Sequence, residues 1–310
     1  MKKTLLTIAL GGLVLAGCSS NDQPAASSAS PTDGLTVVAS HYPVQFLVEQ
    51  VGGDLVNVET LTAPGTEPHD LELTPQQVAE VQEAAAVFYI ESFQPAVDDA
   101  VAESSGEVVD LSAGLPLLEG EEHDHAEGEE HAEGEEHDHG GIDPHVWLDP
   151  VLMQQMSTAV ADALAEADPA NAQTFQDNAA ALNEELATLN TDWAQGTANC
   201  EIDTLVVSHE AFGYLAAQYG FEQRGISGLT PENEPSAAAI AELAEFVNAN
   251  GVTTVYTETL VDPAVAETVA AEAGVQTAVL DPLEGPPAEG DYLSAMRDNL
   301  ETVKAGQNCS

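Results

Sequence analysis

From residue 34 onward, the chain alternates short runs rich in β-branched residues with longer amphipathic stretches. This alternation is typical of an α/β protein, in which helices connect the strands of parallel sheets. Strands are predicted at residues 35–40, 56–61, 86–90, 107–110, 204–208, 221–226, 253–257 and 276–280. Helices are predicted between them at residues 44–51, 74–83, 96–104, 211–219, 236–250 and 263–273. The sequence therefore predicts two α/β lobes, each with a parallel sheet.

One long helix, at residues 168–196, is predicted to link an N-terminal lobe (34–167) to a C-terminal lobe (197–310). Asp168 and Pro169 are typical of a helix start. Apolar residues recur near helical spacing at Phe175, Leu182, Leu186, Leu189 and Trp193. At about 1.5 Å per residue the helix would exceed about 35 Å, roughly one domain diameter. This length favours a rod between the lobes over a helix that covers one sheet, and a rod would restrict hinge motion.

The N-terminus has the pattern of an export signal. A basic start at Lys2 and Lys3 precedes an apolar run that is too short to span a bilayer, and small residues then lead to Cys18. This order resembles a bacterial lipoprotein signal peptide at 1–17, with lipid attached to Cys18; the alternative is an ordinary signal peptide with an incidental cysteine. Residues 18–33 are predicted to be a flexible tether. We therefore expect an extracytoplasmic protein anchored to the membrane by lipid.

The chain is strongly acidic, with a formal charge of -49. Removal of Lys2 and Lys3 with the signal peptide gives -49 - 2 = -51 and leaves Arg224, Arg297 and Lys304 as the strong cations. Such a surface repels nucleic acid, so that class of partner is excluded. Because the acids are spread along the chain, adaptation to a salty habitat is favoured over a surface that gathers cations.

Two cysteines, Cys200 and Cys309, remain once Cys18 is assigned to lipid. In an oxidising compartment, two leftover cysteines usually form a disulfide. A shared metal site is the weaker interpretation because both lie outside every histidine motif.

Most of the nine histidines lie in patterns suited to metal binding. His69 lies in GTEPHDLELTP, His145 in GIDPHVWLDP and His209 in VVSHEAFGYL. A tract at residues 119–141, rich in glutamate and predicted to be a disordered loop, contains His123, His125, His131, His137 and His139. Neutral imidazole is the commonest protein ligand for zinc and similar metals. The tract is predicted to bind metal transiently, the alternative being a merely solvated acidic loop.

A metal site between the lobes is expected because His69 and His209 each follow a predicted strand, where ligands of parallel α/β proteins collect. Tetrahedral zinc needs a fourth ligand, for which Asp281 is the best candidate because it ends the last predicted strand. The competitors for this place are Glu67 and Glu210. Asp70, Asp149 and Glu258 are candidates for acceptors that orient an imidazole. His41 is left open between a role in the site and a structural role.

Five motifs together resemble the metal-specific solute-binding lipoproteins of ABC transporters, the zinc and manganese uptake family of ZnuA/TroA type. They are the signal ending at Cys18, PGTEPHDLELTP, DPHVWLDP, SHEAFGYLA and LDPLEG, in that order. The resemblance extends over essentially the whole mature chain. It implies that His69, His145, His209 and Asp281 are the metal ligands. It also implies a membrane permease and a cytoplasmic ATPase as partners.

The resemblance also bears on the metal. Manganese-selective members have a glutamate where His209 stands, whereas three imidazoles suit zinc. Zn²⁺ is therefore the expected cargo, with manganese or iron as alternatives. Some zinc-binding members have a glutamate directly before the first ligand histidine, where this chain has Pro68, so the role of Glu67 stays open.

Two other functions are compatible with a metal-binding chain: an exported zinc hydrolase and a surface adhesin or metal buffer. An exported zinc hydrolase would require a motif such as HExxH, but Gly213 stands where its second histidine should be. No G-x-S-x-G motif for a serine nucleophile occurs either. A surface adhesin or metal buffer would bind metal through the tract at 119–141. The sequence favours a monomeric binding protein that is not an enzyme.

Overall fold

The computed structural model describes residues 34–120, 141–231 and 235–310. The expected signal peptide, Cys18 and tether lie outside these residues, as do the five histidines of the 119–141 tract. No helix among the described residues is long and apolar enough to cross a membrane.

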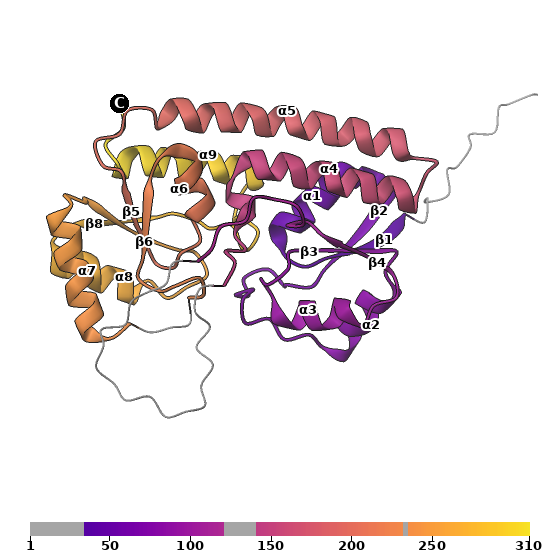
Figure 1. The fold of residues 1–310 in the computed structure, drawn as a ribbon, viewed down its shortest axis with the longest axis horizontal. Coiled ribbons are helices and arrows are strands. Elements are labelled where there is room, and N and C mark those ends of the chain that lie inside the picture. The colour runs from indigo at the N-terminus through magenta and orange to yellow at the C-terminus, as the bar shows by residue number, and fades with distance from the viewer. Residues whose placement is uncertain (1–33, 121–140, 232–234) are drawn as a thin grey trace, which may run out of the picture. The chain divides into compact units, whose positions relative to one another are not determined.

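The first lobe is a parallel four-stranded sheet in the order β2-β1-β3-β4 (Figure 1). Its elements, in chain order, are β1 (Leu35–Ala39), α1 (Tyr42–Gly52), the 3₁₀ turn η1 (Gly53–Leu55), β2 (Val56–Thr60), α2 (Pro75–Glu83), β3 (Ala86–Tyr89), α3 (Pro95–Ala102) and β4 (Glu107–Asp110). Helices cover both faces, so the central strand β3 is buried throughout.

The second lobe repeats this arrangement, with a parallel sheet in the order β6-β5-β7-β8. Its elements are β5 (Thr204–Val207), α6 (Gly213–Tyr219), β6 (Glu222–Gly225), α7 (Ala237–Ala249), β7 (Thr254–Thr257), α8 (Ala264–Ala273), β8 (Gln276–Val279) and α9 (Tyr292–Gly306). Among the described residues, each of the eight predicted strands is found where the sequence predicts it.

Local sequence explains where several helices begin. In α2, Thr74 caps the helix and Gln77 returns the hydrogen bond, forming a capping box, and Pro75 occupies the first turn. In α9, Asp291 and Ser294 form the same reciprocal pair. These caps satisfy backbone N–H groups that the helix itself leaves without partners.

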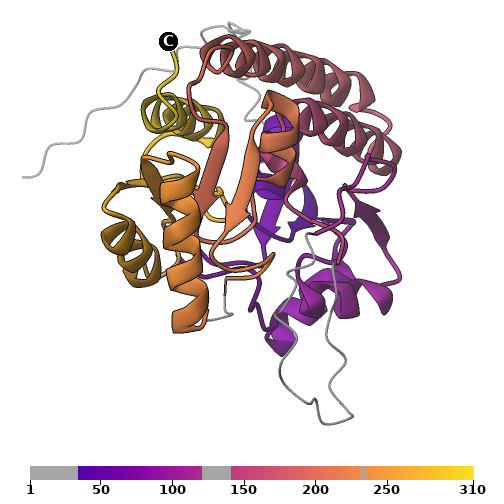
Figure 2. The same ribbon diagram turned by 60° about the vertical axis from the view of Figure 1, so that its left-hand side comes forward.

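Two long helices lie between the lobes in sequence and lie side by side in space (Figures 1 and 2). They are α4 (Pro150–Ala167) and α5 (Ala172–Gly196), and the 3₁₀ turn η2 (Val146–Leu148) precedes α4. The α5 helix packs on α1 of the first lobe and on α9 of the second. Its buried face includes all five apolar residues that the spacing singled out. The predicted fold class, two parallel-sheet α/β lobes joined by a long helix, is confirmed.

One hydrophobic core extends through both lobes and the helices that join them. It contains Leu47 from α1, Leu186 and Trp193 from α5, Leu215 from α6 and Met296 from α9. A separate smaller cluster covers the outer face of each sheet. The shared core ties the lobes together, and the predicted disulfide between Cys200 and Cys309 is present in the second lobe.

Candidate metal centre

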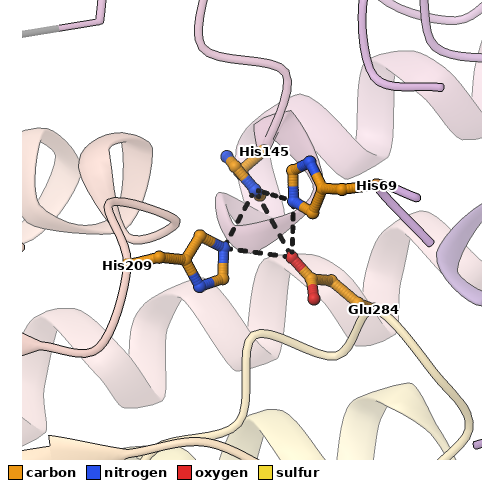
Figure 3. A group of neighbouring side chains, drawn as sticks. All are labelled: His69, His145, His209 and Glu284. Atoms are coloured by element: carbon orange, nitrogen blue, oxygen red, sulfur yellow. Dashed lines mark hydrogen bonds and ion pairs between the residues drawn. The ribbon is translucent and has the colours of Figure 1, made fainter. Parts of the chain in front are cut away.

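Four side chains converge from loops of both lobes: His69, His145, His209 and Glu284 (Figure 3). His69 lies between β2 and α2, and His209 lies two residues after β5. Glu284 lies in the loop after β8, and His145 immediately precedes η2. Three of these loops leave the carboxyl ends of parallel strands, where the sequence analysis expected the site.

The four groups are arranged like the corners of a tetrahedron. The Nε2 atom of His145 lies 3.3 Å from Nε2 of both His69 and His209. The Oε1 atom of Glu284 lies 3.2 Å, 3.4 Å and 3.1 Å from Nε2 of His69, His145 and His209, respectively. Zinc bonds of about 2.0–2.1 Å at tetrahedral angles place neighbouring ligand atoms about 3.3 Å apart. These five separations therefore match the edges of a zinc coordination sphere.

The donor atoms are also shielded from water. His145 and His209 are 0% exposed, Glu284 1% and His69 9%. The second carboxylate oxygen of Glu284, Oε2, is buried and has no hydrogen-bond partner among the described residues. A buried carboxylate that lacks partners is costly unless a cation or donor compensates it. The centre thus has the shape and the charge to receive a cation.

Hydrogen bonds fix the orientation of two of the three rings. Nδ1 of His145 lies 2.8 Å from Oδ1 of Asp143, and Nδ1 of His209 lies 2.8 Å from Oε1 of Glu258. Both carboxylates also accept the backbone N–H of the same histidine, at 2.9 Å in each case. A proton held on Nδ1 by a carboxylate leaves the Nε2 lone pair free to bind a metal.

Contacts with neighbouring residues of the first lobe hold the His69 loop in place. The His69 backbone N–H donates to Oε1 of Glu67 at 2.9 Å, and its ring packs edge-on against Phe93 at 4.7 Å between centroids. The Gln94 amide donates to the carbonyl oxygen of Pro68 at 3.1 Å. Glu67 is therefore placed to shape the loop, and it is not one of the four converging groups.

Aromatic side chains bind the His145 segment to the second lobe. Tyr214 of α6 donates its hydroxyl to the Asp143 carbonyl oxygen at 2.7 Å, and Trp147 donates its indole N–H to the Pro282 carbonyl oxygen at 2.7 Å. Tyr292 of α9 donates to the Trp147 carbonyl oxygen. Three ligand loops, carrying His145, His209 and Glu284, are thus connected through protein contacts.

Charge and burial act in opposite directions on these groups. Burial alone would lower the pKa of His209, but the charges of Glu258 and Glu284 outweigh it and raise that pKa well above its usual value. Hydrogen bonds to Asp143 and Glu284 likewise outweigh burial and raise the pKa of His145. Burial lowers the pKa of His69, and although burial opposes it, the histidines hold the pKa of Glu284 well below its usual value. The pocket therefore favours the anionic form of the Glu284 carboxylate.

The expectation that Asp281 is the fourth converging group is wrong: that group is Glu284, three residues further on. Oδ1 of Asp281 accepts the backbone N–H of Leu283 at 2.8 Å and the Thr259 hydroxyl at 3.2 Å. The sequence contains five Asp-Pro pairs. In every one the aspartate accepts the N–H two residues later, at His145, Val151, Ala170, Ala264 and Leu283. The repeated Asp-Pro pair is the feature of the sequence that indicates a hydrogen bond between the Asp281 carboxylate and the backbone of its own turn.

The remaining candidates have other roles. Glu210 is buried, accepts the N–H of Gly225 at 3.4 Å and is not among the four groups. Asp149 was expected to orient an imidazole; instead it caps α4. The same expectation was wrong for Asp70, which is exposed. Asp143, which the sequence analysis missed, takes that role beside His145, and Glu258 has the expected position beside His209.

His41 lies beside the centre as a neutral histidine. It is 0% exposed, its Nδ1 lies 2.8 Å from the Ser40 hydroxyl, and its ring packs against Phe93 and Trp147. Burial lowers its pKa from 6.5 to about 3. The structure places His41 in the wall of the site and outside the four groups.

The neutral state of His41 predicts an acid-sensitive fold. Below pH 6.5 the unfolded chain takes up a proton that folded His41 refuses until about pH 3, so its contribution to stability is lost as pH falls. Between pH 6.5 and 5 this loss amounts to about 2 kcal/mol. Urea unfolding of the metal-free protein across this range should show a steeper fall for the wild type than for His41→Gln. Parallel curves for the two proteins would contradict the assignment.

A second prediction concerns Gly213. A Cβ atom there would lie 2.6 Å from Oδ2 of Asp143, so Gly213→Ala must displace the carboxylate that orients His145. Loss of such an orienting contact typically costs about 10- to 100-fold in metal affinity. Competition with a coloured zinc chelator measures the change. Gly141→Ala is the matched control, because a Cβ at Gly141 has no atom of the described residues within 4 Å; equal affinities for the two variants would refute the prediction.

Comparison with known proteins identifies the family. The family model described as ZnuA, zinc-uptake complex component A, periplasmic, matches residues 37–306. The chain is 38% identical over 318 residues to the zinc-binding lipoprotein AdcA of Streptococcus pneumoniae (strain R6), covering 98% of this chain and 61% of AdcA. It therefore spans about three fifths of the length of that relative.

One further relative and one solved structure match this chain over nearly their whole length. The high-affinity zinc uptake system protein ZnuA of Bacillus subtilis (strain 168) is 34% identical over 309 residues, which cover 97% of this chain and 96% of ZnuA. The crystal structure of the Zn(II)-bound ZnuA-like domain of Streptococcus pneumoniae AdcA superposes with a TM-score of 0.73 at 35% identity. That comparison covers 89% of this chain and 99% of the domain. With a family model matched over most of its length, a two-lobed fold shared with a zinc-bound domain and a tetrahedral His₃Glu centre, the chain belongs to the ZnuA family of zinc-uptake component A proteins.

Proposed function

We propose that this protein is the extracytoplasmic zinc-binding component of an ABC importer, which captures Zn²⁺ and delivers it to a membrane permease. The observation that carries the proposal is the set of four donors, in which five of the distances between donor atoms are 3.1–3.4 Å. His69, His145, His209 and Glu284 are the ligands in this proposal. Zn²⁺ is the cargo, and the four groups replace its water shell.

The donor set supports zinc over manganese. Three imidazole nitrogens and one carboxylate oxygen in a tetrahedral arrangement are typical of zinc. Manganese favours oxygen donors and a larger coordination number. His209 provides a nitrogen at the position where a glutamate oxygen would favour manganese. Manganese and iron are the metals whose affinity for the site should be compared with that of zinc.

The geometry also supports binding rather than catalysis. A catalytic zinc site keeps one position open for water or substrate. Here four protein groups occupy the four corners, and all are at least nine-tenths buried. Glu210, the residue beside His209 that a hydrolase would use as a base, holds the N–H of Gly225. We propose that the protein has no enzymatic activity.

Location and partners follow from the same proposal. Relatives are named as lipoproteins and as a zinc uptake system protein, which supports a lipid anchor on Cys18 and an extracytoplasmic site of action. The zinc-loaded monomer would dock on the permease, whose transport is driven by a cytoplasmic ATPase. The core shared by both lobes favours small lobe adjustments during capture and release.

Competition calorimetry on the mature protein tests the proposal. The protein should bind one Zn²⁺ ion tightly, and an excess of manganese should not displace that ion. Metal binding should release protons, because the ligand histidines must be neutral to coordinate, and affinity should fall as pH drops through the histidine range. Equal affinities for the two metals would overturn the assignment of cargo.

Deletion of residues 119–141 separates the importer from a metal buffer or adhesin that binds through the tract. All four proposed ligands lie outside that segment. The importer proposal therefore expects the tight site to survive the deletion with its affinity within a few-fold. Disappearance of tight binding would favour the buffer.

A further inference from the structure

The turn that follows β8 is an unusual one for its sequence. Leu283, which is fully buried, adopts φ of 58°, in the left-handed region that is unfavourable for a residue with a bulky side chain. Such conformations persist only where surrounding contacts determine them, and they are concentrated at functional sites. Glu284 is the next residue, so its direction depends on this backbone conformation.

The Asp281 side chain holds Leu283 directly. Oδ1 of Asp281 accepts the N–H of Leu283 at 2.8 Å. The Thr259 hydroxyl, from the loop after β7, donates to the same oxygen at 3.2 Å and so keeps the carboxylate in place. The aspartate closes the turn over Pro282 and sets the direction in which the chain enters Glu284.

Side chains from two other elements hold the first two residues of the turn. Asn299 of α9 accepts the N–H of Asp281 at 3.0 Å and donates to its carbonyl oxygen at 2.7 Å. The indole N–H of Trp147 donates to the carbonyl oxygen of Pro282 at 2.7 Å. With Asp281 and Pro282 held, the Asp281 bond to Leu283 is the contact that acts within the turn, on the residue directly before Glu284.

We propose that Asp281 is a positioning residue that fixes the left-handed turn at Leu283 and thereby aims Glu284 at the three histidines. Asp281 does not bind the metal; it acts through Glu284. This proposal rests on the proposed zinc site, since Glu284 matters to the cargo only as a ligand. In this proposal the Asp281 carboxylate neither coordinates the metal nor merely closes a surface turn.

The chain contains a matched control for this role. Asp262 starts an Asp-Pro-Ala turn whose Oδ1 accepts the Ala264 N–H at 3.0 Å, the same local bond that Asp281 makes. Asp262 is exposed and its turn leads into α8, and none of the four ligands follows this turn in the sequence. Asp262→Ala therefore removes the same hydrogen bond without affecting the centre.

A double-mutant cycle tests the proposal in the full mature protein. Zinc affinity would be measured by competition with a chromophoric chelator for Asp281→Ala, Glu284→Ala and the double variant. Asp281→Ala should weaken zinc binding about 10- to 100-fold, as expected for a group that orients a ligand. The double variant should bind as weakly as Glu284→Ala alone, because no carboxylate is left to position. Asp281→Asn, which keeps an acceptor oxygen, should recover most of the affinity, and Asp262→Ala should match the wild type.

The outcomes separate this proposal from the zinc site itself. If Glu284→Ala leaves zinc affinity unchanged, the proposed centre fails and the positioning role fails with it. If Glu284→Ala weakens binding but Asp281→Ala does not, only the positioning role is overturned. Additive losses in the double variant would also overturn it, because they mean that Asp281 acts independently of Glu284. Thermal unfolding of each metal-free variant shows whether it folds, and Asp281→Asn supplies the comparison if Asp281→Ala does not.

Discussion

His209→Ala should lower the affinity for zinc by about 100-fold or more while leaving the metal-free fold intact. Structural zinc sites contribute roughly 10–16 kcal/mol through four ligands, so loss of one ligand removes about 3 kcal/mol, and each 1.4 kcal/mol is about tenfold in affinity. His209 is one corner of the tetrahedron, and its Nε2 lies 3.1 Å from Oε1 of Glu284 and 3.3 Å from Nε2 of His145. Calorimetry with a competing chelator measures the change.

Two comparisons sharpen this prediction. His131→Ala removes a histidine from the 119–141 tract and should leave the affinity of the tight site near that of the wild type. Glu258→Gln keeps His209 but weakens the contact that holds its Nδ1 proton, so a smaller loss of about 10- to 100-fold is expected. If His209→Ala bound zinc as tightly as the wild type, the ion would have to bind elsewhere.

The strand pattern of this chain could be predicted because it depends on local sequence. Short β-branched runs between amphipathic segments identify buried parallel strands, and all eight lie in the expected places. Two helices were not predicted, α4 and α9. The α4 helix starts at Pro150, the last residue of the DPHVWLDP motif, and proline is common in the first helical turn.

The convergence of His69, His145 and His209 was also predictable in outline, since strand ends of parallel sheets meet at one edge. The choice between Asp281 and Glu284 was not. It depends on the left-handed conformation of Leu283 and on a contact to Trp147, 135 residues away in sequence. The role of Asp143 was also missed. A carboxylate two residues before a histidine can reach both the backbone N–H and the ring of that histidine, as Asp143 does with His145.

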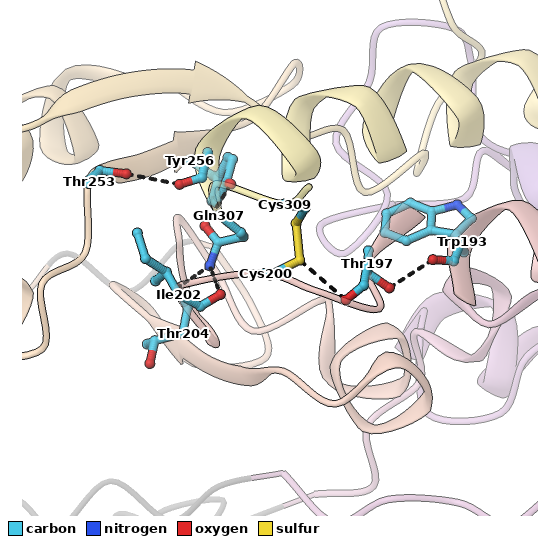
Figure 4. Close-up of a disulfide and its surroundings, with 10 residues drawn as sticks. Trp193, Thr197, Cys200, Ile202, Thr204, Thr253, Tyr256, Gln307 and Cys309 are labelled. Carbon is cyan, nitrogen blue, oxygen red and sulfur yellow. Dashed lines mark hydrogen bonds between the residues drawn. A yellow bond between two sulfur atoms is a disulfide. The ribbon is translucent and has the colours of Figure 1, made fainter. Parts of the chain in front are cut away.

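Removal of the disulfide should produce the largest loss of stability outside the metal centre. The disulfide between Cys200 and Cys309 (Figure 4) joins residues with a sequence separation of 109, and the whole second sheet lies between them in sequence. In the chain-entropy model, a cross-link that closes a loop of about 100 residues stabilises the fold by about 4–5 kcal/mol. Cys200→Ser/Cys309→Ser should therefore lower the free energy of unfolding by about that amount. Both cysteines must be replaced, because a single free thiolate could itself bind zinc.

Neighbouring hydrogen bonds should keep the double variant folded. Gln307 donates to the carbonyl oxygens of Ile202 and Thr204 at 3.3 Å and 2.8 Å, and Tyr256 donates to Gln307 at 3.0 Å (Figure 4). These contacts hold the C-terminal segment beside β5 without the disulfide, and none involves a proposed ligand. Urea unfolding of the metal-free protein should therefore show the lowered stability, with zinc affinity unchanged within a few-fold. The wild type under reducing conditions should unfold like the double variant, and a difference below about 1 kcal/mol between the oxidised wild type and the variant would show that the bond does not constrain the unfolded chain.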